Sequence, residues 1–256
     1  MMEAQFLGVP GVDLWLFGGL ALASFVTTFF GIVSGAAGGL LLLAIMAVIF
    51  PPAVLIPIHT VVQLGAGSSR VVMMHRYIMR ETVAPFLIGA VIGAALGAQI
   101  FVSLSTGLLQ AILGAFILVL AWLPRLGRVG AVGRRFAVLG FGATFLGIFV
   151  SATGTLLAPF VASAAPDRRN HASTLAALMA ITHLIKIVTF GMLGVAIGAY
   201  LPLMAAMVGT AALGNWVGGL VLDRMPEHGF RILFQIVLTV LGLRLLWAAG
   251  KASGFY

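Results

Sequence analysis

Two basic residues lie deep inside apolar stretches of this sequence, where charged side chains are rare. Lys186 lies within the apolar segment 171–199, and Arg70 lies within the segment 53–79. A cation at the centre of a membrane helix costs about 2.5–3.5 kcal/mol on insertion scales, so such a side chain normally faces a cavity or an opposite charge. A second interpretation of Arg70 is that its side chain extends to the cytoplasmic surface of the membrane.

The acidic residues do not supply that opposite charge. All six lie at a terminus, in a loop or at a helix end: Glu3, Asp13, Glu81, Asp167, Asp223 and Glu227. Carriers of protons or sodium usually place a carboxylate in the membrane interior, and none is expected here. The pattern therefore favours an anionic substrate that neutralises the buried bases.

Polar residues accompany both bases. His183 precedes Lys186 by three positions and shares its helix face. His59, Thr60 and Gln63 precede Arg70, and Thr174 resembles Thr60 in placement. The two histidines are candidates either for interhelical hydrogen bonds or for coupling protons to the anion, because imidazole titrates near neutral pH.

A glycine-rich break recurs in the two halves of the chain. It reads Gly-x-x-Ser-Gly-x-x-Gly-Gly over 31–39 and takes a related form over 147–155, and the offset that carries Gly31 to Gly147 also carries Arg70 to Lys186. Matched breaks in apolar segments indicate a transporter site at the membrane midplane. Hydroxyls and helix-end N–H groups at such breaks can bind anions, although the glycines could also serve close packing alone. The candidate ligands there are Ser34, Gly35, Gly38, Ser151, Thr153 and Gly154.

The composition places these residues in a membrane protein. The chain has 256 residues, of which 62% are hydrophobic and 8% charged, against about 25% charged in soluble domains. The net charge of +8 is read as cytoplasmic arginines beside anionic lipid rather than as a nucleic-acid surface. No cysteine is present, so disulfides and thiolate metal sites are excluded.

Five apolar segments follow one another in each half of the chain. They cover about 14–31, 36–50, 53–79, 82–103 and 106–123, then 136–150, 152–165, 171–199, 201–222 and 229–249. The sequence predicts an all-α polytopic membrane bundle, because only helices satisfy their own backbone in lipid and the alternation of a barrel strand is absent. The first two segments of each half are short for a span and predict a broken or re-entrant hairpin ahead of three helices.

Arginines set the expected orientation. They gather after the third segment, in the connector and around later loops on one side, which the positive-inside rule makes cytoplasmic. An odd number of segments per half then makes the two repeats inverted, with both termini in the periplasm. The predicted units are a first repeat over 1–123, a cytoplasmic connector over 124–135 and a second repeat over 136–256.

The paired glycine motifs, the Pro51-Pro52 step and the following His/Thr-bearing helix resemble the TauE/SafE sulfite exporter family. The resemblance spans essentially the whole chain. It implies a permease of the bacterial inner membrane that exports sulfite, an organosulfonate or a related sulfur oxyanion.

These observations together predict a secondary transporter that moves a small oxyanion by alternating access. An anion channel is the alternative, and an intramembrane hydrolase that pairs Ser34 with His59 is the least favoured, because no Gly-x-Ser-x-Gly elbow is present. The expected partners are the anion and the lipid bilayer. A homodimer is left open, and neither a cofactor, a metal nor a nucleic acid is expected.

Overall fold

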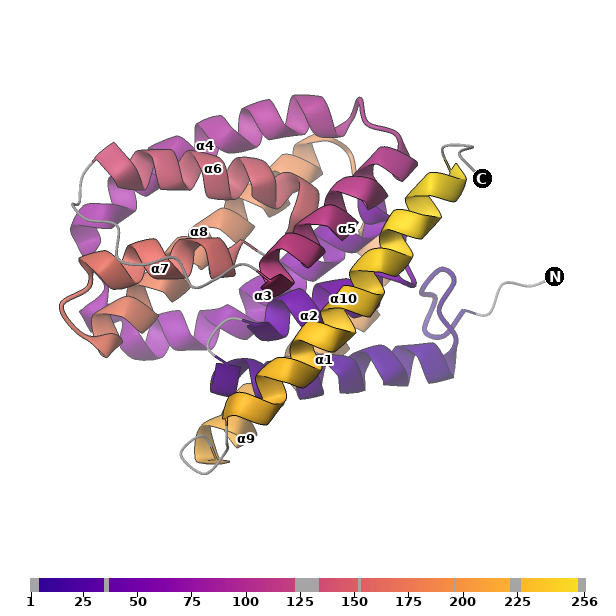
Figure 1. Cartoon of the computed structure of the whole chain (residues 1–256), viewed down its shortest axis with the longest axis horizontal. Helices are drawn as coiled ribbons and strands as arrows, with labels where there is room; N and C mark the ends of the chain where they lie inside the picture. Colours follow the sequence, from indigo (N-terminus) through magenta and orange to yellow (C-terminus); the bar gives the residue numbers. More distant parts are fainter. Residues whose placement is uncertain are drawn as a thin grey trace.

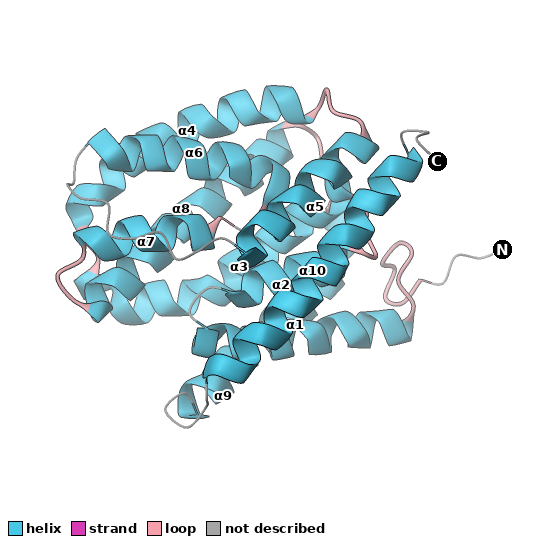
Figure 2. Ribbon diagram, in the orientation of Figure 1, coloured by secondary structure: helices cyan, strands magenta, loops and turns pink. Residues whose placement is uncertain are grey.

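The protein is helical throughout the part of the chain that this computed structural model describes. The described residues are 5–34, 37–122, 134–151, 153–195, 197–221 and 227–252. Within them the chain forms ten α-helices and two short 3₁₀ turns, with no strand (Figures 1 and 2). The predicted all-α class is confirmed.

The helix bounds follow the predicted segments closely. In chain order the helices are α1 Leu14–Ser34, α2 Ala37–Ala47, α3 Pro52–Met74, α4 Arg80–Phe101, α5 Thr106–Trp122, α6 Arg134–Val150, α7 Gly154–Ala164, α8 Arg168–Met192, α9 Leu201–Val221 and α10 Glu227–Ala252. The 3₁₀ turns are η1 His75–Tyr77 and η2 Gly198–Tyr200.

Several of these helices are long and apolar enough to cross a bilayer. Among the described residues, five such stretches lie at Leu14–Gly31, Arg80–Phe101, Arg169–Met192, Gly198–Gly218 and Gln235–Ala252. Their backbone groups are hydrogen-bonded within each helix, as a lipid environment requires. The chain is a polytopic, multi-pass membrane protein.

Two helices of the described part of the chain are far shorter than a membrane span. α2 and α7 have 11 residues each, or about 16 Å at 1.5 Å per residue, against a hydrocarbon core of about 30 Å. They are the second members of the predicted hairpins. The expectation that the first member would also be short is wrong for α1, whose 21 residues reach Ser34. α1 continues past Gly31, so this glycine does not end the helix. Gly31 instead lets α2 pack close to α1, since a Cβ at Gly31 would lie 3.0 Å from the Cα of Gly38.

The described acidic side chains serve helix starts. The Asp167 carboxylate accepts hydrogen bonds from the N–H groups of Arg169 and Asn170, both at 2.8 Å, and so caps α8. Asp13 accepts from the N–H of Leu16 at 2.7 Å and caps α1 in the same way. These acids therefore stabilise helix ends and stand apart from the buried bases.

The helices of the two halves are intermixed, because the most extensive helix contacts join a helix of one half to a helix of the other. α1 packs on α9, α4 on α6, α3 on α8 and α5 on α10, so each of these pairs joins one half to the other (Figure 1). Glycines allow the closest of these approaches, since a Cβ at Gly89, Gly93 or Gly140 would meet backbone of the facing helix in the α4–α6 pair. Gly214 has the same relation to α1. Small residues of this kind let membrane helices approach each other closely.

Candidate functional site

The centre of the protein holds a group of buried polar side chains around Ser151. This residue lies between α6 and α7 and is only 1% exposed. The Lys186 Nζ donates to Ser151 Oγ at 2.9 Å, while His59 Nδ1 lies 3.1 Å and Thr60 Oγ1 3.0 Å from the same oxygen. We call these four residues the Ser151 cluster. It joins α3 of the first half to α8 and the α6–α7 break of the second.

The backbone at Ser151 is unusual. Its φ is +56°, in the left-handed region that costs a non-glycine residue roughly 1–2 kcal/mol. The turn carries the chain from the end of α6 into the start of α7 and aims the hydroxyl at α3 and α8. A strained conformation at a buried polar residue motivates a functional role for that residue.

Lys186 is a fully buried base without an acidic neighbour. Its side chain is 0% exposed, and Ser151 is its one hydrogen-bond partner in the part of the chain that the structure describes. An ammonium group has three N–H donors, so two are left for another acceptor. Gly147 lies beside the side chain, where a Cβ would be at an ordinary contact distance of 3.5 Å from Lys186 Cδ. An isolated buried charge is costly, and an anion beside Lys186 would offset that cost.

His59 links the two glycine-rich breaks. Its Nε2 lies 2.9 Å from the Gly39 carbonyl oxygen of α2, and its Nδ1 faces Ser151. A carbonyl oxygen can only accept, so Nε2 carries a proton and donates to it. One imidazole therefore ties the start of α2 to the α6–α7 break across the centre of the molecule.

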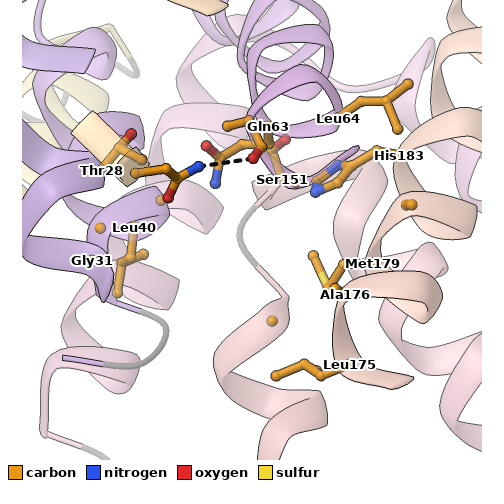
Figure 3. Close-up of a pocket in the computed structure, with 17 residues that line it drawn as sticks. Thr28, Gly31, Leu40, Gln63, Leu64, Ser151, Leu175, Ala176, Met179 and His183 are labelled. Carbon is orange, nitrogen blue, oxygen red and sulfur yellow. Dashed lines mark hydrogen bonds between the residues drawn. The ribbon is translucent and has the colours of Figure 1, made fainter. Parts of the chain in front are cut away.

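A cavity of about 160 Å³ adjoins the Ser151 cluster. That volume is well above the roughly 10–15 Å³ that one water molecule needs, so a small anion has room there. Figure 3 shows Thr28, Gly31 and Leu40 on one side of it and Leu175, Ala176 and Met179 on the other, with Gln63, Ser151 and His183 at one end. Both hairpins, both third helices (α3 and α8) and α9 contribute to the walls.

Several buried polar groups lack hydrogen-bond partners among the described residues, and one of them, His183, lines the cavity. His183, which is 3% exposed and lines the cavity, has no partner for Nδ1 among the described residues. The fully buried Thr153 hydroxyl has none either, and Thr144 and Thr155 share this property. α7 begins at Gly154 in the cavity wall, and the first N–H groups of a helix have no partner within it. The His183 ring, the Thr153 hydroxyl ahead of α7 and the positive end of α7 would satisfy an oxyanion.

Comparison with known protein families assigns the chain. A family model described as sulfite exporter TauE/SafE matches residues 20–245, from within α1 into α10. The chain belongs to the TauE/SafE sulfite exporter family. The resemblance predicted from the glycine motifs is confirmed, and membership makes the protein a membrane transporter. Comparisons with curated proteins and with solved structures find no match.

In this TauE/SafE chain the predicted site residues fall into distinct groups. Five of them line the cavity, and these are Gly38, Gln63, Ser151, Gly154 and His183. Another three join Ser151 behind the wall, and these are His59, Thr60 and Lys186. Thr153 is buried beside Gly147, at the α6–α7 break. The structure thus brings most of the predicted residues to one place.

The remaining predicted residues are not part of that group. Thr174 lies away from the cavity wall, where its hydroxyl accepts a 2.9 Å hydrogen bond from the N–H of Met79 ahead of α4. Arg70 belongs to α3 and Ser34 to the end of α1, but their side chains lie outside the described part of the structure. Gly35 and most of the connector 124–135 lie outside the described residues as well.

Asn215 is a cavity residue that the sequence reasoning missed. It lies on α9, lines the cavity and donates from Nδ2 to the Ala66 carbonyl oxygen of α3 at 2.9 Å. A signal was present, because an amide within the apolar segment 201–222 calls for a polar partner or a cavity. Thr28 and Met179 also line the cavity, and nothing in their local sequence distinguishes them from packing residues.

Proposed function

We propose that this TauE/SafE protein is a secondary transporter that exports a small sulfur oxyanion across the bacterial inner membrane. The observation that carries the proposal is Lys186, a fully buried base with no carboxylate partner among the described residues. It donates to Ser151, and Ser151 lines a cavity of suitable size. Sulfite or an organosulfonate is the expected cargo, because sulfur-bound oxygens match N–H and O–H donors.

The proposed binding mode uses the groups that lack partners. The anion lies in the cavity against Ser151 and His183, with the free N–H groups of Lys186 directed toward it. The first turn of α7, with Gly154 and the Thr153 hydroxyl, contributes further donors. Arg70 and Ser34 remain proposed contributors on the basis of their sequence positions.

We also propose that the two halves form an inverted repeat that alternates access. Packing supports this proposal. If the halves are exchanged, α1 on α9 becomes α6 on α4, while the α3–α8 and α5–α10 pairs map onto themselves. The half-length helices α2 and α7 correspond in the same way. Repeats of this kind rock around a midplane site that each side reaches in turn. The arginine-rich connector faces the cytoplasm in this proposal, and both termini face the periplasm.

Binding measurements on purified protein test the proposed cargo. Sulfite, sulfoacetate, taurine, thiosulfate and sulfate are titrated calorimetrically, with choline as a cationic control. At least one sulfur anion should bind, choline should not, and Lys186→Met should abolish the binding. Absence of binding by all five compounds, or unchanged binding in Lys186→Met, would contradict the proposal.

A serine hydrolase is a second candidate, because one observation favours it. The Ser151 Oγ lies 2.9 Å from Lys186 Nζ and 3.1 Å from His59 Nδ1, within reach of two basic groups. This differs from the pairing of Ser34 with His59 considered from sequence. No described carboxylate orients His59, whose second nitrogen faces a backbone carbonyl. Covalent labelling of Ser151 by a fluorophosphonate probe, absent in Ser151→Ala, would favour the hydrolase over the transporter.

A further inference from the structure

The hydrogen bonds around Ser151 require one more proton than the Ser151 cluster holds when the His59 imidazole is neutral. Five short contacts connect the Ser151 cluster to itself and to backbone: His59 Nε2 to Gly39 O at 2.9 Å, His59 Nδ1 to Ser151 Oγ at 3.1 Å, Thr60 Oγ1 to Ile56 O at 2.7 Å, Thr60 Oγ1 to Ser151 Oγ at 3.0 Å, and Lys186 Nζ to Ser151 Oγ at 2.9 Å. Each hydrogen bond needs its own proton.

Two of these protons are fixed by acceptors that cannot donate. The Gly39 carbonyl takes the proton on His59 Nε2, and the Ile56 carbonyl takes the hydroxyl proton of Thr60. Lys186 supplies the proton of its own contact. Ser151 then has a single hydroxyl proton for two neighbours, His59 Nδ1 and Thr60 Oγ1, which both present lone pairs. With a neutral imidazole, one of the two contacts has no proton.

A protonated imidazole satisfies all five contacts. Nδ1–H then donates to Ser151, Lys186 donates to the second lone pair of Ser151, and the Ser151 hydroxyl donates to Thr60. Ser151 accepts two hydrogen bonds and donates one, which is the full capacity of a hydroxyl in that arrangement.

Without a bound anion, a positive charge on His59 beside that of Lys186 is unfavourable. His59 is 0% exposed, and the ionisable groups that face it among the described side chains are Lys186 and His183 on α8. The other packed elements add no acid: α2, α5 and α9 contain no ionisable residue, α6 has Arg134 and Arg135 at its exposed start, and η1 has His75, Arg76 and Tyr77. Two neighbouring cations without a carboxylate repel each other in a buried setting. An anion in the adjoining cavity removes that penalty.

Resting on the proposed function, we infer that binding of the anion takes up one proton from solution at His59 Nδ1. The loaded carrier then holds the anion and this proton together. Ser151 provides the route, since it lines the cavity and contacts Nδ1: it receives a proton from the cavity side and passes its own to the imidazole. Anion and proton therefore move in the same direction through the membrane.

Calorimetry in buffers of different ionisation enthalpy measures the proton directly. The full-length protein is titrated with sulfate and methanesulfonate, which stay ionised near neutral pH, and with sulfite after its own titration is subtracted. We expect uptake of about one proton per bound anion and an affinity that weakens about tenfold for each unit of rising pH. Anion binding without proton uptake overturns this inference and leaves the proposed transporter intact. Absence of binding by all three probes overturns both.

Variants separate His59 from its neighbours. His59→Gln should bind the anion without proton uptake, whereas His171→Gln, which alters a histidine bonded to the Ala158 carbonyl, should keep it. Proton uptake that persists in His59→Gln but disappears in His183→Gln would contradict the assignment.

A second variant leaves every histidine in place. Thr60→Val keeps the side-chain shape but removes a lone pair, so the neutral imidazole satisfies the remaining contacts and proton uptake should fall. The matched control is Thr182→Val, which changes another buried threonine with a bond to its own helix, to the Leu178 carbonyl at 3.0 Å. Equal proton uptake in both threonine variants and the wild type would refute the inference.

Discussion

The Lys186→Met substitution tests whether the Lys186 ammonium binds the substrate or instead stabilises the fold. The Lys186 ammonium lies 2.9 Å from Ser151 Oγ, and Ser151 lines the cavity. An oxyanion in the cavity against Ser151 is taken to lie about 4 Å from Nζ. At that distance two unit charges attract by about 4 kcal/mol at an effective dielectric constant of about 20. Each 1.4 kcal/mol is tenfold, so Lys186→Met should weaken anion affinity about a thousandfold.

The same substitution should spare stability. Methionine has a similar length and fits an apolar environment, and the change removes an uncompensated buried charge. The lost hydrogen bond to Ser151 is worth about 1 kcal/mol, which the removed desolvation cost offsets. The melting temperature of the empty protein should therefore stay level or rise.

Flux of radiolabelled sulfite into proteoliposomes and thermal unfolding in detergent together test this prediction. The control is Lys251→Met, which alters an exposed lysine whose Nζ lies 4.1 Å from the ring centre of Trp247, and which should change neither property. Undiminished sulfite flux in Lys186→Met would refute the assigned site. A large fall in melting temperature would instead identify Lys186 as a structural residue.

Substitutions at four further residues test separate parts of the structure. Gly38→Ala should lower the melting temperature more than Gly154→Ala. A Cβ at Gly38 would collide with backbone of α1, whereas a Cβ at Gly154 would meet a methionine sulfur at an ordinary 3.5 Å. Equal shifts in melting temperature would contradict the packing at the two breaks. Thr174→Val should cost roughly 1 kcal/mol of unfolding free energy by leaving the N–H of Met79 unpaired, with transport per folded molecule unchanged, and a transport defect would return Thr174 to the binding site. Ser151→Gly should relieve the positive φ and raise thermal stability relative to Ser151→Ala, while both variants lose anion binding; retained binding in either would remove Ser151 from the site.

The sequence predicted the elements of the site better than their connections. Lys186 stands out because a base in an apolar segment is rare, and its burial follows. The two breaks stand out because glycine and hydroxyl residues interrupt apolar runs. That Ser151 would be the meeting point depends on how α3 crosses α8, which no local pattern encodes.

Matching the halves by position predicted some roles and missed others. Thr174 was paired with Thr60, but Thr174 lies early in α8, beside the segment ahead of α4, and bonds there instead. The length of α1 was also missed, because a glycine that permits close packing reads the same in sequence as one that ends a helix. Asn215 shows the converse case, in which a single polar residue in an apolar segment could have been identified.

Counterflow in proteoliposomes tests the central claim most directly, because it requires both a carrier and the Lys186 site. Vesicles loaded with unlabelled sulfite are diluted into a trace of labelled sulfite, and uptake of label is followed over time. A carrier should concentrate the label transiently above its outside level, and Lys186→Met should abolish that overshoot. Simple equilibration without overshoot would identify a channel, and an overshoot that survives in Lys186→Met would contradict the proposed site.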